Sequence, residues 1–173
     1  MAAAGLSACG HKEAHPTVAD NEGFYVDAGP VTYQVQLSRE LNPYSQEDRQ
    51  YLVGLHATPP KADQEWFAVF VWAKNQTSSP QTTTNSFDIV DTQGNKYYPL
   101  KLNAGVNPYA WTSQSLAPGM VEPNPTTTAG YGPTGGRLLL FKLGNSVYDN
   151  RPLTLQIRAP SGNTVWATIS LDL

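Results

Sequence analysis

Residues 65–73 constrain the fold more than any other part of the sequence. They read Glu-Trp-Phe-Ala-Val-Phe-Val-Trp-Ala, so apolar residues occupy both faces of a strand, and most of them are aromatic or β-branched. Such residues favour strands, and a strand that is apolar on both faces is covered on both sides. We therefore expect a central strand here, with Trp66 and Trp72 on one face, in the core or at its rim.

Several other segments alternate apolar and polar residues or form short apolar runs, as strands do. The alternation is strict in residues 31–37. Residues 91–95 and 160–163 are turn sequences that contain glycine, and each joins two strands into a hairpin. The other expected strands are residues 51–55, 86–90, 96–100, 137–143, 153–158 and 164–171. About eight short strands predict an all-β, immunoglobulin-like antiparallel sandwich, with a small barrel as the alternative.

Two stretches fall outside the strand pattern. Residues 45–50 are predicted to form one or two helical turns, with Ser45 as N-cap and acidic residues in the first turn. Residues 103–136 are too long for an ordinary hairpin loop and hold five prolines among threonine, asparagine and glycine. We expect this Pro/Thr-rich segment to run over the surface as a long loop.

Cys9 is the single cysteine, which excludes an internal disulfide and any metal site with several thiolates. It follows Leu-Ser-Ala and precedes Gly10. This order resembles the lipobox of bacterial lipoproteins, in which the cysteine is lipidated and the preceding residues are removed. Only eight residues precede it, without lysine or arginine, whereas a secretory signal has about 15–30. We expect the mature protein to begin at a lipidated Cys9; the alternative is a free cysteine in a disordered tail.

The chain of 173 residues is about one domain long. We divide it into a truncated signal remnant with lipobox at residues 1–9, a flexible polar tether at 10–28 and one sandwich domain at 29–173. No stretch approaches the roughly 18 apolar residues of a membrane span, so membrane attachment is expected through the lipid at Cys9. The expected location is extracytoplasmic, on the outer face of the cell membrane.

Residues 29–173 resemble a family of bacterial surface lipoproteins of actinobacterial type. These carry an immunoglobulin-like domain of unknown function, related in fold to the secreted immunogenic antigens of mycobacteria. The resemblance rests on a strand ending in Asn75, a strand followed by Asp91, Gly94 and Tyr97, a Leu-x-Pro-Gly segment at 116–119 and a Phe-containing strand at 138–143. It implies an extracytoplasmic domain without established catalytic residues. Residues 38–60 and the Pro/Thr-rich segment depart from the family pattern, so we expect the specific role of this chain there.

Charge and histidine spacing argue against nucleic-acid and metal binding. Lysine and arginine number 11 against 14 acidic residues, the net charge is −3, and no basic cluster is present to neutralise phosphates. His11 and His15 have the i, i+4 spacing of a zinc site, but the acid between them is misplaced and Pro16 follows. We expect no nucleic acid, metal or other cofactor to bind.

The sequence also offers no recognisable catalytic site. The chain has no Gly-x-Ser-x-Gly motif that would present a nucleophilic serine to His56 as its base. The neighbouring acids Glu47 and Asp48 are typical of a helix start, and Asp91, near Asp88, is typical of a turn. We therefore expect no enzymatic activity.

The sequence Asn-Pro-Tyr occurs at residues 42–44 and again at 107–109. In one interpretation both are turns whose tyrosine covers an end of the sandwich. In the other, loop aromatics form an exposed surface for a protein or glycan partner. The candidate partner-binding residues are Tyr44, Asn107, Tyr109, Trp111 and Tyr131.

Together these features predict a non-catalytic, lipid-anchored extracytoplasmic immunoglobulin-like domain that mediates protein interaction at the cell surface. Its partner is an unknown cell-surface protein or glycan. The alternative is a carbohydrate or cell-wall binding module that uses the loop aromatics.

Overall fold

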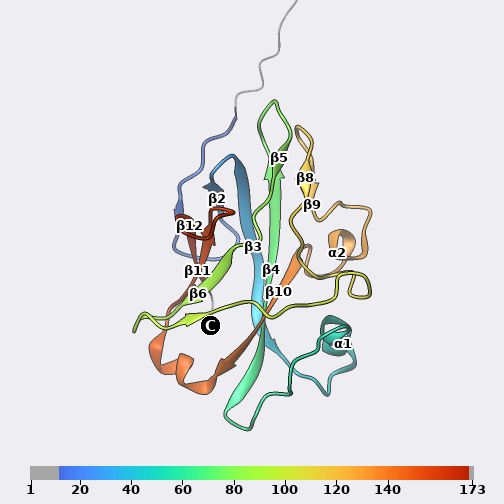
Figure 1. Ribbon diagram of the computed structural model, residues 1–173, viewed down its shortest axis with the longest axis vertical. Coiled ribbons are helices and arrows are strands. Elements are labelled where there is room, and N and C mark those ends of the chain that lie inside the picture. The colour runs from blue at the N-terminus through green and yellow to red at the C-terminus, as the bar shows by residue number, and fades with distance from the viewer. Residues whose placement is uncertain (1–11, 172–173) are drawn as a thin grey trace, which may run out of the picture.

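Two β-sheets packed face to face form the frame of the protein, which the computed structural model describes for residues 12–171 (Figure 1). The first sheet contains, in order, β1 (Val18–Ala19), β12 (Val165–Leu171), β11 (Leu153–Arg158), β6 (Phe87–Val90) and β7 (Lys96–Tyr97). The second contains β10 (Arg137–Gly144), β4 (Gln64–Asn75), β3 (Val31–Leu41) and β2 (Tyr25–Ala28), and β9 (Val121–Glu122) also pairs with β4. Among these strands only β1 and β12 pair in parallel. The expected all-β sandwich is confirmed.

The strand order is that of an immunoglobulin-like domain. Strands β3, β4 and β10 take the positions of strands A, B and E, and β6, β11 and β12 take those of C, F and G. Short elements surround this frame: α1 (Gln46–Arg49), η1 (Gln50–Leu52), α2 (Thr128–Tyr131), η2 (Asn145–Asn150), and a separate pair formed by β5 (Gln81–Thr82) and β8 (Ser115–Leu116). In Figure 1, α1 and α2 lie beside the second sheet, on the side away from the first.

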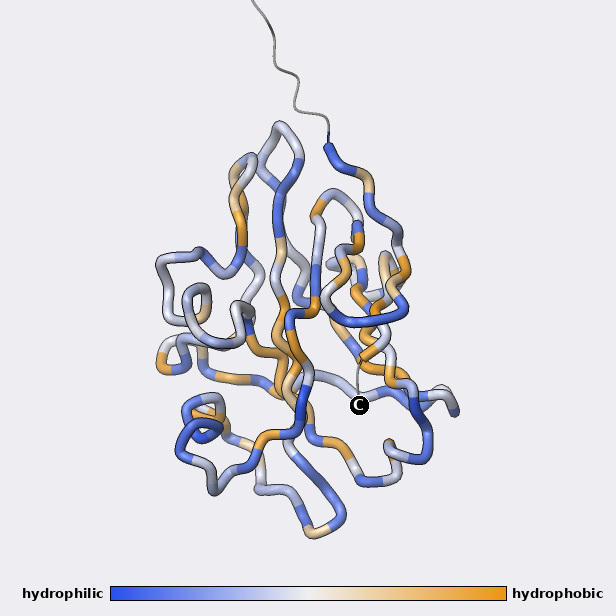
Figure 2. The backbone as a smooth tube through the Cα atoms, turned by 180° about the vertical axis from the view of Figure 1, so that it is seen from behind, coloured by the Kyte–Doolittle hydropathy of each residue, from blue (hydrophilic) through white to orange (hydrophobic). Residues whose placement is uncertain are grey.

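The central strand β4 is buried on both faces, as its sequence predicts. One face contributes Phe67, Val69 and Val71 to the core between the sheets. The other contributes Trp66, Ala68 and Phe70 to a second apolar cluster, in which Tyr51, Tyr109 and Ala129 cover the sheet. Figure 2 shows apolar residues concentrated along the central strands. The second sheet is therefore the middle layer of three.

The flexible tether expected at residues 10–28 is wrong for its described part. Strand β1 pairs with β12, and β2 pairs with β3. Ala19 is 7% exposed, and Val26 and Ala28 are fully buried. Backbone pairing and burial of these few apolar side chains outweigh the polar composition, so the sandwich begins before residue 29. Cys9 and His11 lie outside the described residues.

Most expected strands are present, and the hairpins β6–β7 and β11–β12 are confirmed. The strand expected at residues 51–55 is wrong: η1 occupies its first part, and Leu55 forms only an isolated bridge with Leu102. Tyr51 enters the second cluster fully buried, and its neighbour Leu52 and then Leu55 pack against the same cluster, which follows the turn of a helix rather than the alternation of a strand. The helix at α1 is confirmed, although the Ser45 side chain makes no capping hydrogen bond.

The Pro/Thr-rich segment at 103–136 lies over the second sheet, but it is not only a surface loop. It contains β8, β9 and α2. Asn107, Tyr109 and Ala129 are buried, because this segment supplies the cover for the outer face of β4 and β10.

Candidate functional site: a groove around Trp66

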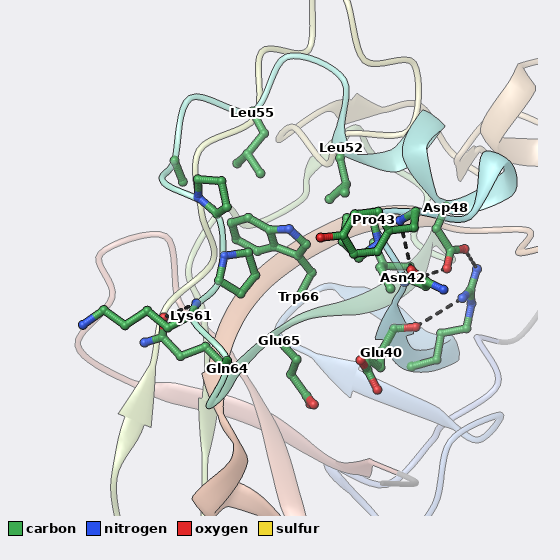
Figure 3. A pocket seen from close by; sticks show the side chains of 17 residues that line it. Glu40, Asn42, Pro43, Asp48, Leu52, Leu55, Lys61, Gln64, Glu65 and Trp66 are labelled. Atoms are coloured by element: carbon green, nitrogen blue, oxygen red, sulfur yellow. Dashed lines mark hydrogen bonds and ion pairs between the residues drawn. The ribbon is translucent and has the colours of Figure 1, made fainter.

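A groove of about 1150 Å³ lies where the ends of β3 and β4 meet the segment 42–63 that connects them (Figure 3). Trp66 lies at its centre, with Leu52 and Leu55 on one side and Glu40 and Glu65 on the other. The connecting segment falls within residues 38–60 for most of its length, the insertion in which the sequence placed a specific role. We call this site the Trp66 groove.

One end of the segment is held by Asp48, a buried residue of α1. Its Oδ1 lies 2.5 Å from Nη2 of Arg39 on β3, and its Oδ2 accepts a hydrogen bond of 2.8 Å from the backbone N–H of Asn42. Burial alone raises the pKa of the Asp48 carboxyl, but the hydrogen bonds from Arg39 and Asn42 outweigh it, so the pKa lies below its usual value. Asp48 is therefore a charged anchor of the groove wall.

The other anchors come from elements distant in sequence. The fully buried Tyr51 ring contacts the rings of Phe70 and Tyr109, with centroids 5.0 and 4.8 Å away. Asn107 donates its side-chain amide to the carbonyl oxygens of Tyr51 and Val53, at 3.0 and 2.9 Å. These contacts fix the wall before any ligand binds, which lowers the entropy lost on binding.

Trp66 and Lys142 fasten the far end of the segment. Lys142 Nζ lies 5.5 Å from the centroid of the Trp66 ring and donates to the carbonyl oxygen of Thr58 at 2.9 Å. Pro59 and Pro60 follow and line the groove. The indole is thereby held between a cation and the apolar wall.

Glu65 gives the groove an acidic end. Its side chain accepts a hydrogen bond of 2.8 Å from the Tyr148 hydroxyl at Oε2, while Oε1 is buried and has no hydrogen-bond partner among residues 12–171. Burial raises the pKa of Glu65 and outweighs the hydrogen bond from Tyr148, and the nearby Glu40 carboxylate raises it further. Burial, with help from Glu65, also raises the pKa of Tyr148 to about 12. Because Oε1 of Glu65 is buried, the accessible carboxylate at this end is that of the exposed Glu40.

The structure separates the five candidate partner-binding residues. Tyr44 is 92% exposed on the rim of the Trp66 groove, and Tyr131 is 71% exposed on α2. Asn107 and Tyr109 are buried, and Trp111 packs against the core between the sheets and donates Nε1–H to the carbonyl oxygen of Thr84. The expected exposed surface of Tyr109, Trp111 and Tyr131 is wrong, because two of its members fill the interior.

The interpretation of both Asn-Pro-Tyr copies as turns is confirmed. In each copy the asparagine Oδ1 accepts a hydrogen bond of 2.9 Å from the tyrosine N–H two residues later, in Asn42–Tyr44 and in Asn107–Tyr109. Only the second tyrosine covers the sheet; its hydroxyl donates to Gln50 Oε1 at 2.7 Å.

The acidic pairs considered from the sequence hold the fold together. Asp48 pairs with Arg39, and Asp88 pairs with Arg158. Asp91 accepts hydrogen bonds from the N–H groups of Gln93 and Asn95 and so closes its turn. Within residues 12–171 no three His, Cys, Asp or Glu side chains gather to form a metal site. In the same range, no helix has the length and hydropathy needed to cross a membrane.

Sequence reasoning missed Trp66 as a site residue because an aromatic residue in an apolar strand indicates core. The departure from the family pattern at residues 38–60 was the one sequence feature that indicated a site in this region. Its position next to β4 follows only from the pairing of Leu41 with Trp66.

No family model and no curated protein matches the sequence. Solved structures of several bacterial proteins share its fold. The yjhA protein of Bacillus subtilis has a TM-score of 0.51 and 12% identity, over 88% of this chain and 99% of that one. A putative lipoprotein (ycdA) of Bacillus subtilis has a TM-score of 0.52 and 10% sequence identity. The match covers 86% of this chain but only 38% of that one.

A conserved hypothetical protein of Bacillus anthracis has a TM-score of 0.51 and 14% identity, over 84% of this chain and 91% of that one. These likenesses show the fold alone. The chain is thus similar to bacterial β-sandwich proteins, one of them named as a lipoprotein, and the narrower resemblance to actinobacterial lipoproteins and mycobacterial antigens stays a prediction.

Proposed function

We propose that this chain is a non-catalytic binding domain that holds an extended peptide segment of a partner protein in the Trp66 groove. The observation that carries the proposal is the groove itself: about 1150 Å³, with aromatic, leucine and proline side chains on a wall that the protein anchors at several points. This volume is somewhat above the range of about 300–1,000 Å³ that is usual for small-molecule pockets, so the groove has room for a peptide segment.

The chemistry of the groove favours a segment that carries a cationic side chain beside apolar residues. The partly exposed Leu52 and Leu55, which pack against the cluster that contains the buried Trp66, offer apolar surface, and the acidic end offers the exposed carboxylate of Glu40. A lysine or arginine gains a charge-assisted hydrogen bond at the exposed Glu40 carboxylate, while apolar residues of the same segment pack on Leu52 and Leu55.

Selection of random linear peptides on the immobilised full chain tests this proposal. We expect the recovered peptides to share a lysine or arginine next to apolar residues. Their binding should fall about tenfold in Tyr44→Ala and in Glu40→Gln. The matched controls Tyr131→Ala and Asp20→Asn change exposed residues outside the groove and should bind as the parent does. Recovery of no peptide, or equal binding by all four variants, contradicts the proposal.

We also propose that a lipid at Cys9 anchors the domain to the outer face of the cell membrane. The lipobox resemblance supports this, as does the name of one structural neighbour. Intact-mass measurement of protein extracted from native membranes should give the mass of a chain that begins at an acylated Cys9. An unmodified Cys9 contradicts the anchor and leaves the groove proposal untouched.

The alternative in which loop aromatics bind carbohydrate gains no support. Tyr109 is 6% exposed and Trp111 is engaged with the core, so neither can stack on a sugar.

A further inference from the structure

A second group of aromatic and polar side chains lies on the outer face of the second sheet, near the end of β4 opposite the Trp66 groove. Tyr25 on β2, Gln34 on β3 and Trp72 on β4 occupy one row across the three strands, because Tyr25 pairs with Gln34 and Gln34 with Trp72. The two rings reach over this row, with centroids 5.5 Å apart. Tyr25 is 42% exposed and Trp72 is half-buried.

The residues before β1 form a wall beside this row. The N–H of His15 donates to Oδ2 of Asp27 at 3.1 Å, and Lys12 Nζ lies 3.3 Å from the same oxygen. The hydroxyl of Thr32 donates to the other oxygen of Asp27 at 2.6 Å. The His15 ring stands 5.3 Å from the ring of Tyr25. This part of the chain is therefore tied to the sheet and encloses a pocket with it.

The pocket has a volume of about 130 Å³, and its lining combines the two aromatic rings with polar groups of both charges, Glu13 and Lys74 among them. This is room for one small ring rather than for a whole oligomer. Beyond the pocket, the amides of Gln34 and Gln36 continue along β3, joined by a hydrogen bond from Gln36 to Gln34. A longer ligand could thus enter with one unit and lie over the amides.

The chemistry of these groups suits a pyranose ring. Its C–H face is apolar and packs on an aromatic ring, while its hydroxyls both donate and accept, as glutamine amides do. Because Glu13 and Lys74 line the same pocket, charge favours neither an anion nor a cation. A nucleic acid would need a basic surface, which a chain with net charge −3 and no basic cluster does not offer.

We infer that the surface formed by Tyr25, Gln34, Gln36 and Trp72, with the adjoining pocket, is a subsite for one pyranose unit of a neutral polysaccharide, N-acetylated sugars included. It differs in place and chemistry from the Trp66 groove, and neither site depends on the other. The aromatics that take part are on strands, not on the loops that the sequence suggested.

Co-sedimentation of the full chain with cellulose, chitin and isolated peptidoglycan sacculi tests the inference. We expect binding to at least one of these polymers and a loss of about tenfold in Tyr25→Ala and in Trp72→Ala. Tyr25→Phe keeps the ring and should keep most of the binding. Tyr44→Ala, in the Trp66 groove, and Tyr131→Ala are matched controls that should bind normally.

Circular dichroism of each variant separates loss of the subsite from loss of the fold, and Gln36→Ala supplies a second test on an exposed side chain. Gln36→Ala should weaken binding without removing an aromatic ring. Absence of binding to all three polymers contradicts the inference. So does binding that folded Tyr25→Ala and Gln36→Ala retain in full.

Discussion

Arg39 on β3 and Asp48 on α1 form an ion pair with an Nη2–Oδ1 distance of 2.5 Å, and the same carboxylate accepts the backbone N–H of Asn42. One buried acid thus joins the end of a core strand to both the turn and the helix that follow it. The Trp66 groove exists because this connection holds its wall at a fixed distance from the sheet. The first prediction concerns this acid.

Asp48→Ala should lower the free energy of unfolding by about 1–3 kcal/mol, because it leaves the N–H of Asn42 and the guanidinium of Arg39 without their acceptor. Urea denaturation followed by tryptophan fluorescence measures the loss. Glu47→Ala is the matched control, an exposed acid on the same helix, and should change stability by less than about 0.5 kcal/mol. Equal effects of the two substitutions would show that the ion pair does not hold the wall.

Glu65 should make stability fall as the pH rises. Burial raises its pKa in the folded protein above the usual 4.5, so between the two values the folded chain binds more protons than the unfolded chain. The free energy of unfolding therefore decreases through this window and does not recover above the folded pKa. Glu65→Gln does not titrate and should lose this decrease.

Urea unfolding of the parent chain and of Glu65→Gln, at pH values from about 4 to about 8, measures the difference. The advantage of the variant should grow with pH. Glu40→Gln, which removes the neighbouring charge, should give a smaller change in the same direction. Parallel stability curves for the parent and Glu65→Gln would contradict the proposed titration.

The two Asn-Pro-Tyr copies should respond differently to the same substitution. Asn107→Ala removes a buried amide that makes three hydrogen bonds, to the carbonyls of Tyr51 and Val53 and from the N–H of Tyr109. We expect a loss of about 3 kcal/mol. Asn42→Ala removes one bond at an exposed turn and should cost about 0.5 kcal/mol. Chemical denaturation compares the two; a similar loss in both would refute a buried clamp at Asn107.

Gly29→Ala should destabilise the protein more than Gly94→Ala. Both glycines have a positive φ, +62° and +82°, so each substitution adds about 1 kcal/mol of backbone strain. At Gly29 the new methyl group would also lie 2.8 Å from the Trp166 ring, whereas at Gly94 nothing lies within 4 Å. The clash should add about 1 kcal/mol or more, seen as a larger drop in thermal midpoint. Equal drops would mean that Trp166 moves aside freely.

The sequence by itself determined the all-β class and the central strand. Residues 65–73 carry two apolar faces, and in the fold each face belongs to a different apolar cluster. The two hairpins followed from their turn sequences. Such features are local. The period of the apolar residues and the backbone preferences of glycine can be recognised in the sequence without knowledge of the tertiary contacts.

Only the tertiary structure decided which aromatic and acidic side chains are available to a ligand. Tyr44 and Tyr109 stand in the same Asn-Pro-Tyr motif, yet one is exposed and the other covers the sheet, because the second copy faces Tyr51 across the outer face of β4. Trp72 is half-buried, and its ring lies beside Tyr25, on a strand that the sequence assigned to a tether. Burial depends on the partners that long-range strand pairing brings together, and a local sequence pattern does not contain them.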